Sequence, residues 1–266
     1  MKFQVVRNIF IYKMRSFLKR LFNNKKIKIL PKDFLSKIFS LEKAKGIFVH
    51  AGLSKIRFIE GVSNPYAYLL TELEKNYKVI FVPGFTPSFR NSGIFHKKYS
   101  KPEYGMWSKL FLKDSEQRTM DAIHSIQVKG DYDFSSCDHQ DSFGSNSCFN
   151  KLIKDNILVA DIGTDDFVCT FIHVVECLNK VPYIYLSEVD GVVYSDDNFF
   201  YNVKQLNYEP KIAYRWNRNK LVRELKNNGL LRDYSSNGFL VYFFYAGDVF
   251  KFLDKKVKEN SWYLVI

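Results

Sequence analysis

Short apolar runs alternate with amphipathic segments in the first third of the chain. Residues 46–50 and 78–82 are apolar runs that end in turn residues, which predicts two buried strands. Between them, residues 65–76 carry apolar side chains at helical spacing. The order strand, turn, helix, strand is typical of a parallel crossover unit, in which ligands bind at the carboxyl ends of the strands. Gly52 and Thr86 fall at that edge.

The same alternation continues to the end of the chain. Strands are predicted at 126–128, 156–163, 182–194 and 238–244, and helices at 34–41, 102–112, 170–176, 219–226 and 246–258. The rest of segment 195–237 is polar and rich in aromatic residues. We therefore predict an α/β fold, with a single domain built on a central mixed, largely parallel sheet flanked by helices.

Basic residues are concentrated at the N-terminus. The formal net charge is +12, yet ten of the 40 basic residues and none of the acidic residues lie in residues 1–32. Residues 1–26 also have apolar side chains at helical spacing, so we divide the chain into a basic amphipathic helical arm, residues 1–42, and a domain, residues 43–266. Because the domain itself is nearly neutral, we expect no nucleic-acid-binding face.

Two arrangements of the arm are open. It packs on the domain, which we favour, or residues 1–26 lie on an anionic membrane surface. No apolar run approaches the roughly 20 residues that span a bilayer. We expect a cytoplasmic protein, with peripheral contact to the inner face of the membrane as the alternative; the pattern gives no indication of the oligomeric state.

The four cysteines do not indicate a metal site or a disulfide framework. They lack the paired C-x-x-C spacing and have no histidine at zinc-finger distance. Reduced thiols are the simplest expectation for Cys137, Cys148, Cys169 and Cys177.

A histidine and a serine interrupt the apolar alternation where the strand at 126–128 begins. The segment from Arg118 to Gly130 is RTMDAIHSIQVKG, with His124 at the start of the strand. A strand fixes the backbone while the preceding loop leaves one face open, so this position suits a catalytic side chain. Taken alone, one such histidine is more often a structural residue.

This segment resembles the arginine, serine or threonine, histidine-proline-x-histidine-serine block of the aminoglycoside 3-N-acetyltransferase family. His124 and Ser125 match the second histidine, which is the catalytic one in that family, and the serine that follows it. Asp121 and Ala122 replace the usual histidine and proline, so the loop before His124 is expected to be shaped differently.

Further blocks resemble the same family, in the same order, from about Gly46 to the C-terminus. Ala51 and Gly52 replace two serines of the family's first turn, which loses their hydroxyls and keeps the backbone N–H groups. These blocks cover the turn of Ala51, Gly52 and Leu53, with Ser54 and Lys55 next to it, Thr86 after the second strand, the loop of Asp138 and His139, and the helix with Thr170, His173 and Glu176.

The resemblance implies transfer of an acyl group from a coenzyme A thioester to an amine, without a metal. His124 would be the general base, which contributes typically ~10² to 10⁴ in rate. A carboxylate beside it would fix its tautomer, with Glu176 as first candidate and Asp138 as second. The expected coenzyme and oxyanion contacts are residues 51–55, Thr86 and Ser125, and the acceptor candidates are His139, Asp166, Thr170 and His173.

The charge of the domain bears on the acceptor. Aminoglycosides are polycations that need several carboxylates, whereas nucleotide-linked amino sugars are anionic. The nearly neutral domain and its basic arm favour a nucleotide-linked amino sugar, for surface polysaccharide, over an aminoglycoside as in antibiotic resistance. A catalytically inactive binding protein of this fold and a membrane-associated scaffold are the alternatives, and acylation of Cys137 or Cys148 is the alternative to direct transfer.

Overall fold

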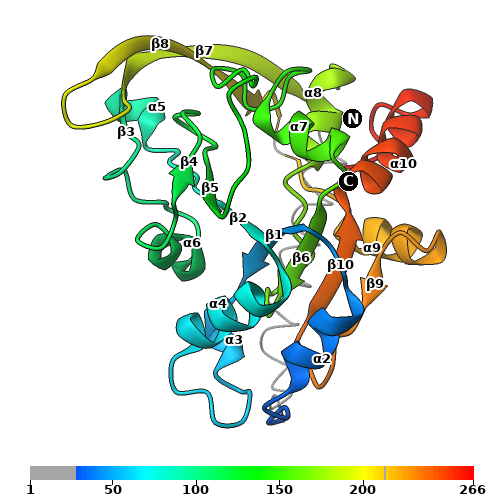
Figure 1. The fold of residues 1–266 in the computed structure, drawn as a ribbon. Coiled ribbons are helices and arrows are strands. Elements are labelled where there is room, and N and C mark those ends of the chain that lie inside the picture. Colours follow the sequence, from blue (N-terminus) through cyan, green and yellow to red (C-terminus); the bar gives the residue numbers. More distant parts are fainter. Residues whose placement is uncertain (1–27, 213) are drawn as a thin grey trace.

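A seven-stranded mixed sheet organises the fold in the computed structural model, which describes residues 28–212 and 214–266 (Figure 1). The strand order is β4-β5-β2-β1-β6-β10-β9. β1 is parallel to both of its neighbours, β2 and β6, and the outer strands are antiparallel. The strands are β1 (Gly46–Ala51), β2 (Val79–Pro83), β4 (Gln117–Arg118), β5 (Ile126–Lys129), β6 (Leu158–Ile162), β9 (Arg232–Asp233) and β10 (Val241–Tyr245).

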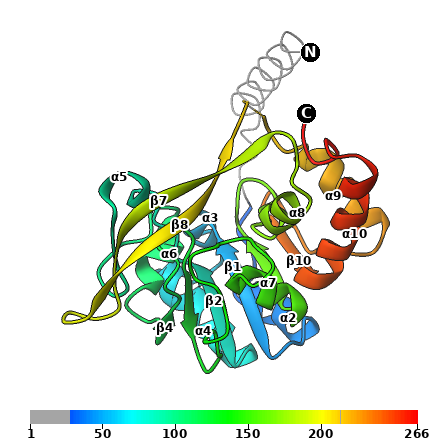
Figure 2. The ribbon, with the colours of Figure 1, turned by 90° about the horizontal axis from the view of Figure 1, so that it is seen from above.

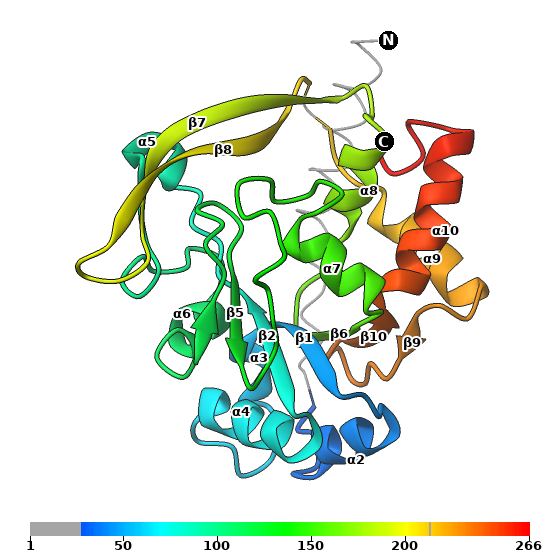
Figure 3. The same ribbon diagram turned by 45° about the horizontal axis from the view of Figure 1, so that its top comes forward.

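Helices cover both faces of this sheet (Figure 3). Successive side chains of a strand point to opposite faces, so Ile47 and Phe48 belong to different cores. The Phe48 core is closed by α7 (Cys148–Lys154), α8 (Ile172–Leu178), α9 (Arg218–Asn227) and α10 (Ala246–Glu259). The Ile47 core is closed by α2 (Phe34–Leu41), α3 (Leu53–Ile56), α4 (Pro65–Asn76) and α6 (Met106–Phe111). The predicted single-domain α/β fold with a mixed central sheet is confirmed, and its parallel part consists of the three central strands.

The predicted crossover unit is present as β1, α4 and β2. Asn64 begins α4 because its side-chain oxygen accepts the Ala67 N–H at 3.1 Å, and Pro65 fits the first helical turn. At the carboxyl end of β1, a Cβ on Gly52 would lie 2.1 Å from the carbonyl oxygen of Gly163, which follows β6. Only glycine allows these two strand ends to approach so closely.

A long hairpin forms a second, three-stranded sheet. β7 (Ile184–Tyr194) and β8 (Phe200–Pro210) pair along their full length, and β3 (Ile94–His96), preceded by α5 (Phe89–Ser92), adds to β7. The hairpin runs from α8 to α5 across one end of the molecule (Figures 1 and 2). β8 lies in the segment predicted to be an excursion; its residues alternate between buried and exposed, so it has no apolar run.

The expected contact with a membrane surface concerns the N-terminal arm. Residues 1–26, predicted to be an amphipathic helix, lie outside the described residues. None of the helices within 28–212 and 214–266 has the length and apolarity needed to cross a membrane.

Candidate active site

His124 lies in a tight turn at the carboxyl end of β2, two residues before β5 begins. Asp121 builds this turn, because its Oδ1 accepts the N–H groups of Ile123 at 2.9 Å and of His124 at 2.7 Å. The residue that departs from the family pattern therefore shapes the loop, as expected for a short acid that can bond to nearby backbone N–H groups.

The His124 ring lies between two phenylalanines. Its centroid is 5.2 Å from that of Phe85 and 4.7 Å from that of Phe143. Nδ1 lies 3.0 Å from Oγ of Ser142, and among the described residues Nε2 makes no hydrogen bond. Burial lowers the pKa of His124 well below its usual value, and the nearby charges of His173 and Arg90 lower it further. The imidazole is therefore neutral at neutral pH.

Ser125 and Thr86 hold the turn in place from behind. The Ser125 hydroxyl donates to the Gly84 carbonyl at 2.7 Å and accepts from Arg118 Nε at 2.9 Å. The Thr86 hydroxyl donates to the Ala122 carbonyl at 2.6 Å. Both residues are buried, so each hydroxyl hydrogen goes to the backbone, where burial requires a partner. Their predicted contacts with the coenzyme or the oxyanion find no support in these positions.

Glu176 lies at the centre of a different cluster from the one expected. Its carboxylate accepts from His173 Nδ1 at 2.9 Å, from Trp216 Nε1 at 2.8 Å and from the Tyr183 hydroxyl at 3.2 Å, and it makes no hydrogen bond with His124. The carboxylate is completely buried. Its immediate role is thus to fix the His173 ring, as the shared helical face of these two residues predicts.

Phe143 brings the two histidine clusters together. Its ring centroid is 4.7 Å from that of His124 and 5.0 Å from that of His173. Phe143 belongs to the loop between β5 and α7, which also carries Ser142. His124 and His173, both predicted site residues, therefore line the same region of the molecule.

The other two predicted residues of this loop point elsewhere. Asp138 accepts the Gln140 N–H at 2.8 Å, a local turn bond, and has no hydrogen bond with His124. His139 Nδ1 lies 3.3 Å from Sγ of Cys148. The neighbouring thiols of Cys137 and Cys148 affect each other, so that the pKa of Cys148 is raised and that of Cys137 is lowered. None of the four cysteines forms a disulfide bond within the described residues.

The predicted coenzyme turn has few unused donors. Gly52 N–H donates to the Ile162 carbonyl at 2.9 Å, and Lys55 N–H donates to the Gly52 carbonyl at 3.1 Å. Leu53 and Ser54 come before Lys55 in the first turn of α3, where backbone N–H groups have no carbonyl partner within the helix. Their N–H groups are therefore the donors that α3 leaves available. The Lys55 ammonium is held by the Thr164 carbonyl at 3.0 Å and by Asp165 at 2.8 Å.

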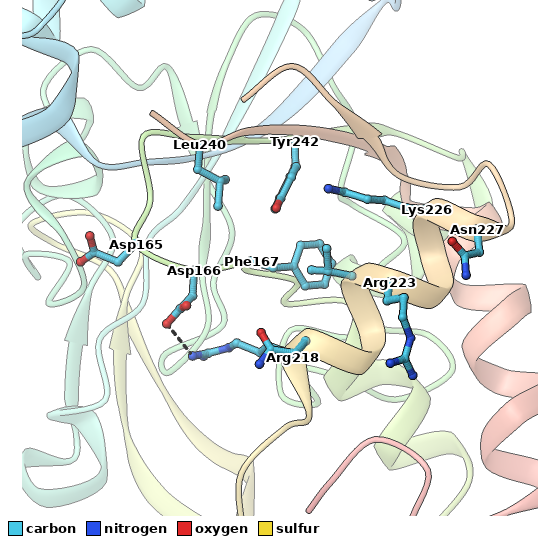
Figure 4. Close-up of a pocket in the computed structure, with 11 residues that line it drawn as sticks. Asp165, Asp166, Phe167, Arg218, Arg223, Lys226, Asn227, Leu240 and Tyr242 are labelled. Carbon is cyan, nitrogen blue, oxygen red and sulfur yellow. Dashed lines mark ion pairs between the residues drawn. The ribbon is translucent and has the colours of Figure 1, made fainter. Parts of the chain in front are cut away.

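A pocket of about 470 Å³ opens beside this turn, between the loop after β6, α9 and β10 (Figure 4). Asp166 lies on its wall and pairs with Arg218 at 3.5 Å. The predicted acceptor residue Thr170 is buried and lies 3.3 Å from Nε2 of His50, whose pKa burial lowers to about 4. Asp166 and Thr170 thus belong to the edge at β1 and β6 and are linked to other partners than His124.

Sequence reasoning missed Asp121, Ser142 and Arg90. Asp121 was noticed only as a departure from the family pattern, and no pattern indicates that Ser142, 18 residues further along, returns to the His124 ring. Within the described ranges, no three histidine, cysteine or acidic residues are arranged to hold a metal ion.

Comparison with known structures shows the same architecture. YokD from Bacillus subtilis is 16% identical, with a TM-score of 0.68 over 88% of this chain and 96% of that one. AAC-IIIb in a binary complex with CoASH is 14% identical, with a TM-score of 0.70 over 86% and 97%. A histidine-to-alanine mutant of aminoglycoside acetyltransferase AAC(3)-IVa, in complex with apramycin, is 16% identical, with a TM-score of 0.63 over 87% and 93%.

Sequence comparison gives the family. No curated protein sequence matches the chain significantly. The family profile described as Aminoglycoside 3-N-acetyltransferase matches residues 48–258, which is most of the chain and includes every block quoted above except the start of the first strand. The chain therefore belongs to the aminoglycoside 3-N-acetyltransferase family, whose enzymes use coenzyme A to acetylate amines of amino sugars.

Proposed function

We propose that the protein transfers an acyl group from a coenzyme A thioester directly to the amine of a nucleotide-linked amino sugar, with His124 as the general base. One observation carries this proposal: a neutral imidazole at the carboxyl edge of the sheet, with Nδ1 engaged by Ser142 and Nε2 free among the described residues. A base must be unprotonated before it can take a proton, and the low pKa of His124 meets that requirement.

The reaction then needs two proton transfers, one from the amine to His124 and one from His124 to the leaving thiolate. The amine nitrogen attacks the thioester carbon while His124 Nε2 takes its proton, and a tetrahedral oxyanion forms. The oxyanion collapses as the carbon–sulfur bond breaks, and the imidazolium returns the proton to the leaving thiolate. The N–H groups of Leu53 and Ser54 are our candidates for contacts with the coenzyme or the oxyanion.

Arg90 supports an anionic acceptor. It is an exposed residue of α5, and its Nε donates to Asn207 at 2.8 Å. Its positive charge contributes to the low pKa of His124, and it also lowers the pKa of Glu209, so this carboxylate offsets part of the charge. The remaining positive potential near His124 favours an anionic acceptor over a polycationic aminoglycoside.

The test is release of free coenzyme A thiol from acetyl-coenzyme A with nucleotide-linked amino sugars and, separately, with aminoglycosides. We expect release with the former only, and a loss of ~10² or more in kcat/KM for His124→Ala. His96→Ala is the matched control, because His96 lies in β3 and pairs with Asp197 at 3.3 Å. Release with aminoglycosides alone would assign the resistance activity instead, and coenzyme A binding without release by any acceptor would favour a binding protein.

We propose that the enzyme is cytoplasmic and that its arm packs on the domain, with peripheral contact to the inner face of the membrane as the alternative. Deletion of residues 1–27 should leave turnover unchanged, and sedimentation of the full-length but not of the truncated protein with vesicles that contain anionic lipid would support the membrane alternative. Vesicle binding by the full-length protein, together with absence of turnover in both the full-length and the truncated protein, would point to a scaffold.

A further inference from the structure

Asp121, Ser142 and His124 form a buried chain of polar side chains. The exposed fraction is 3% for Asp121 and 2% for Ser142. The Ser142 Oγ lies 3.0 Å from His124 Nδ1 on one side, and on the other it is near enough to the Asp121 carboxyl group to lower its pKa. The carboxylate that supports the histidine is thus one hydroxyl away, and it is neither Glu176 nor Asp138.

The direction of each bond in this chain follows from donor counting. An ionised carboxylate only accepts, so the single hydrogen of the Ser142 hydroxyl points to Asp121. The serine oxygen can then only accept from Nδ1–H of His124. A neutral imidazole carries one N–H, so its lone pair is left on Nε2, the nitrogen that has no hydrogen bond with the described residues.

We propose that Asp121 and Ser142 are positioning residues, which hold His124 in the tautomer protonated at Nδ1 and so leave Nε2 free to act as the base. The inference rests on the proposed function for its kinetic consequence. During acyl transfer the amine proton goes to Nε2, while Nδ1–H stays bonded to Ser142 and the Asp121 charge offsets the imidazolium.

Gln205 links the turn that contains His124 to the loop that contains Ser142. It is completely buried in β8, where its Oε1 accepts the Ala122 N–H at 3.1 Å and its Nε2 donates to the Gln140 carbonyl at 2.9 Å. One side chain therefore ties the turn of His124 to the loop of Ser142. This cross-link prevents the two segments from separating.

The charges near Asp121, Ser142 and His124 preserve the donor and acceptor roles of these three side chains at neutral pH. Burial raises the pKa of Asp121 to about 6, a value that its hydrogen bonds limit and that Asp141 raises. The carboxylate is therefore mainly ionised at pH 7.5. The other titratable or charged groups facing the chain are Cys148 beside Asp121, and His173 and Arg90 beside His124.

Asp121→Asn keeps the shape of the side chain and reverses the donor and acceptor roles along the Asp121–Ser142–His124 series. Oδ1 of Asp121 already accepts two backbone N–H groups, so the single oxygen of an asparagine stays there and its amide NH₂ faces Ser142. Ser142 then accepts from the amide and donates to His124 Nδ1, which moves the imidazole proton to Nε2. With its lone pair facing Ser142, His124 cannot take the amine proton.

The test is nitrogen-15 NMR of histidine-labelled full-length protein at pH 7.5, combined with kinetics. We expect the wild-type His124 signals to show a protonated Nδ1, and those of Asp121→Asn a protonated Nε2 with kcat/KM lower by ~10² to 10⁴ at little change in KM. Ser142→Ala should give a mixture of tautomers, and Ser142→Thr, which retains a hydroxyl, should restore the wild-type spectrum.

Two outcomes would overturn the inference: a wild-type His124 protonated at Nε2, or an Asp121→Asn spectrum identical to the wild type. The tautomer is measured without coenzyme or acceptor, so absence of turnover with every acceptor would count against the proposed function and leave this result intact. If Asp121→Asn does not fold, the wild-type tautomer and the comparison of Ser142→Ala with Ser142→Thr decide the question.

Discussion

Replacement of Glu176 by alanine separates a structural from a catalytic role for this carboxylate. Glu176 has no exposed surface, and three donors end on it, from His173, Trp216 and Tyr183. Alanine would remove the acceptor of all three and leave a cavity on the apolar side of α8.

The expected loss of stability follows from these contacts. A buried donor without a partner costs ~1–3 kcal/mol. The Tyr183 hydroxyl is completely buried and loses its partner fully, whereas the Trp216 and His173 side chains are partly exposed, His173 by 33%, and can bind water instead. We expect Glu176→Ala to lower the free energy of unfolding by about 3–5 kcal/mol, because the lost packing of a completely buried side chain adds to the lost hydrogen bonds. Since 1 kcal/mol shifts Tm by roughly 2–4 °C in a domain of this size, Tm should fall by at least ~6 °C.

Urea unfolding and thermal melting measure this loss directly. Tyr183→Phe is the matched control, because it removes one of the three donors and should cost only about 1 kcal/mol. The urea slope should be unchanged in both variants. If Glu176→Ala were as stable as the wild type but lost most of its kcat/KM with an altered pH profile, the structural role would be refuted, and the direct role in catalysis expected from the sequence would return.

Three further results are expected. His50, whose pKa is lowered from 6.5 to about 4, stays neutral in the folded state while the unfolded chain takes up a proton, so stability falls with pH from about 6.5 to about 4. Urea titrations should show that wild type loses about 3 kcal/mol more than His50→Gln across that window, and parallel curves would contradict this. Gly52→Ala, whose Cβ would meet the Gly163 carbonyl, should cost about 3 kcal/mol in thermal melts and raise the KM for acetyl-coenzyme A, and a neutral effect would show that the strand ends can move apart. Cys137→Ser and Cys148→Ser should each retain most of the turnover under direct transfer; detection of an acylated cysteine by mass spectrometry would instead support the covalent route.

The crossover unit and the helix of His173 could be predicted because their signals are local. A buried parallel strand is an uninterrupted apolar run, and β1 and β2 lie within a residue or so of the predicted ranges. His173 and Glu176 share a helical face whatever the tertiary fold, so their contact follows from their spacing alone.

What escaped prediction depends on contacts between segments far apart in the chain. The partner of His124 was sought among carboxylates that match the family, whereas the structure supplies Ser142 and, behind it, Asp121. β8 was missed because polar and apolar side chains are mixed on both of its faces, so its sequence lacks a regular apolar alternation. Its Tyr201 and Val203 nevertheless pack into a small core with Val193 of β7.

The hairpin of β7 and β8 constrains how this enzyme can diversify. Through Gln205 and Tyr208, whose hydroxyl donates to Asp141 at 2.8 Å, the hairpin holds both the turn and the loop that surround His124. A chimera that imports a relative's hairpin alone would break both of these supports. Recombination should therefore yield active proteins only when segments 121–124 and 138–147 are inherited together with the hairpin, as one unit.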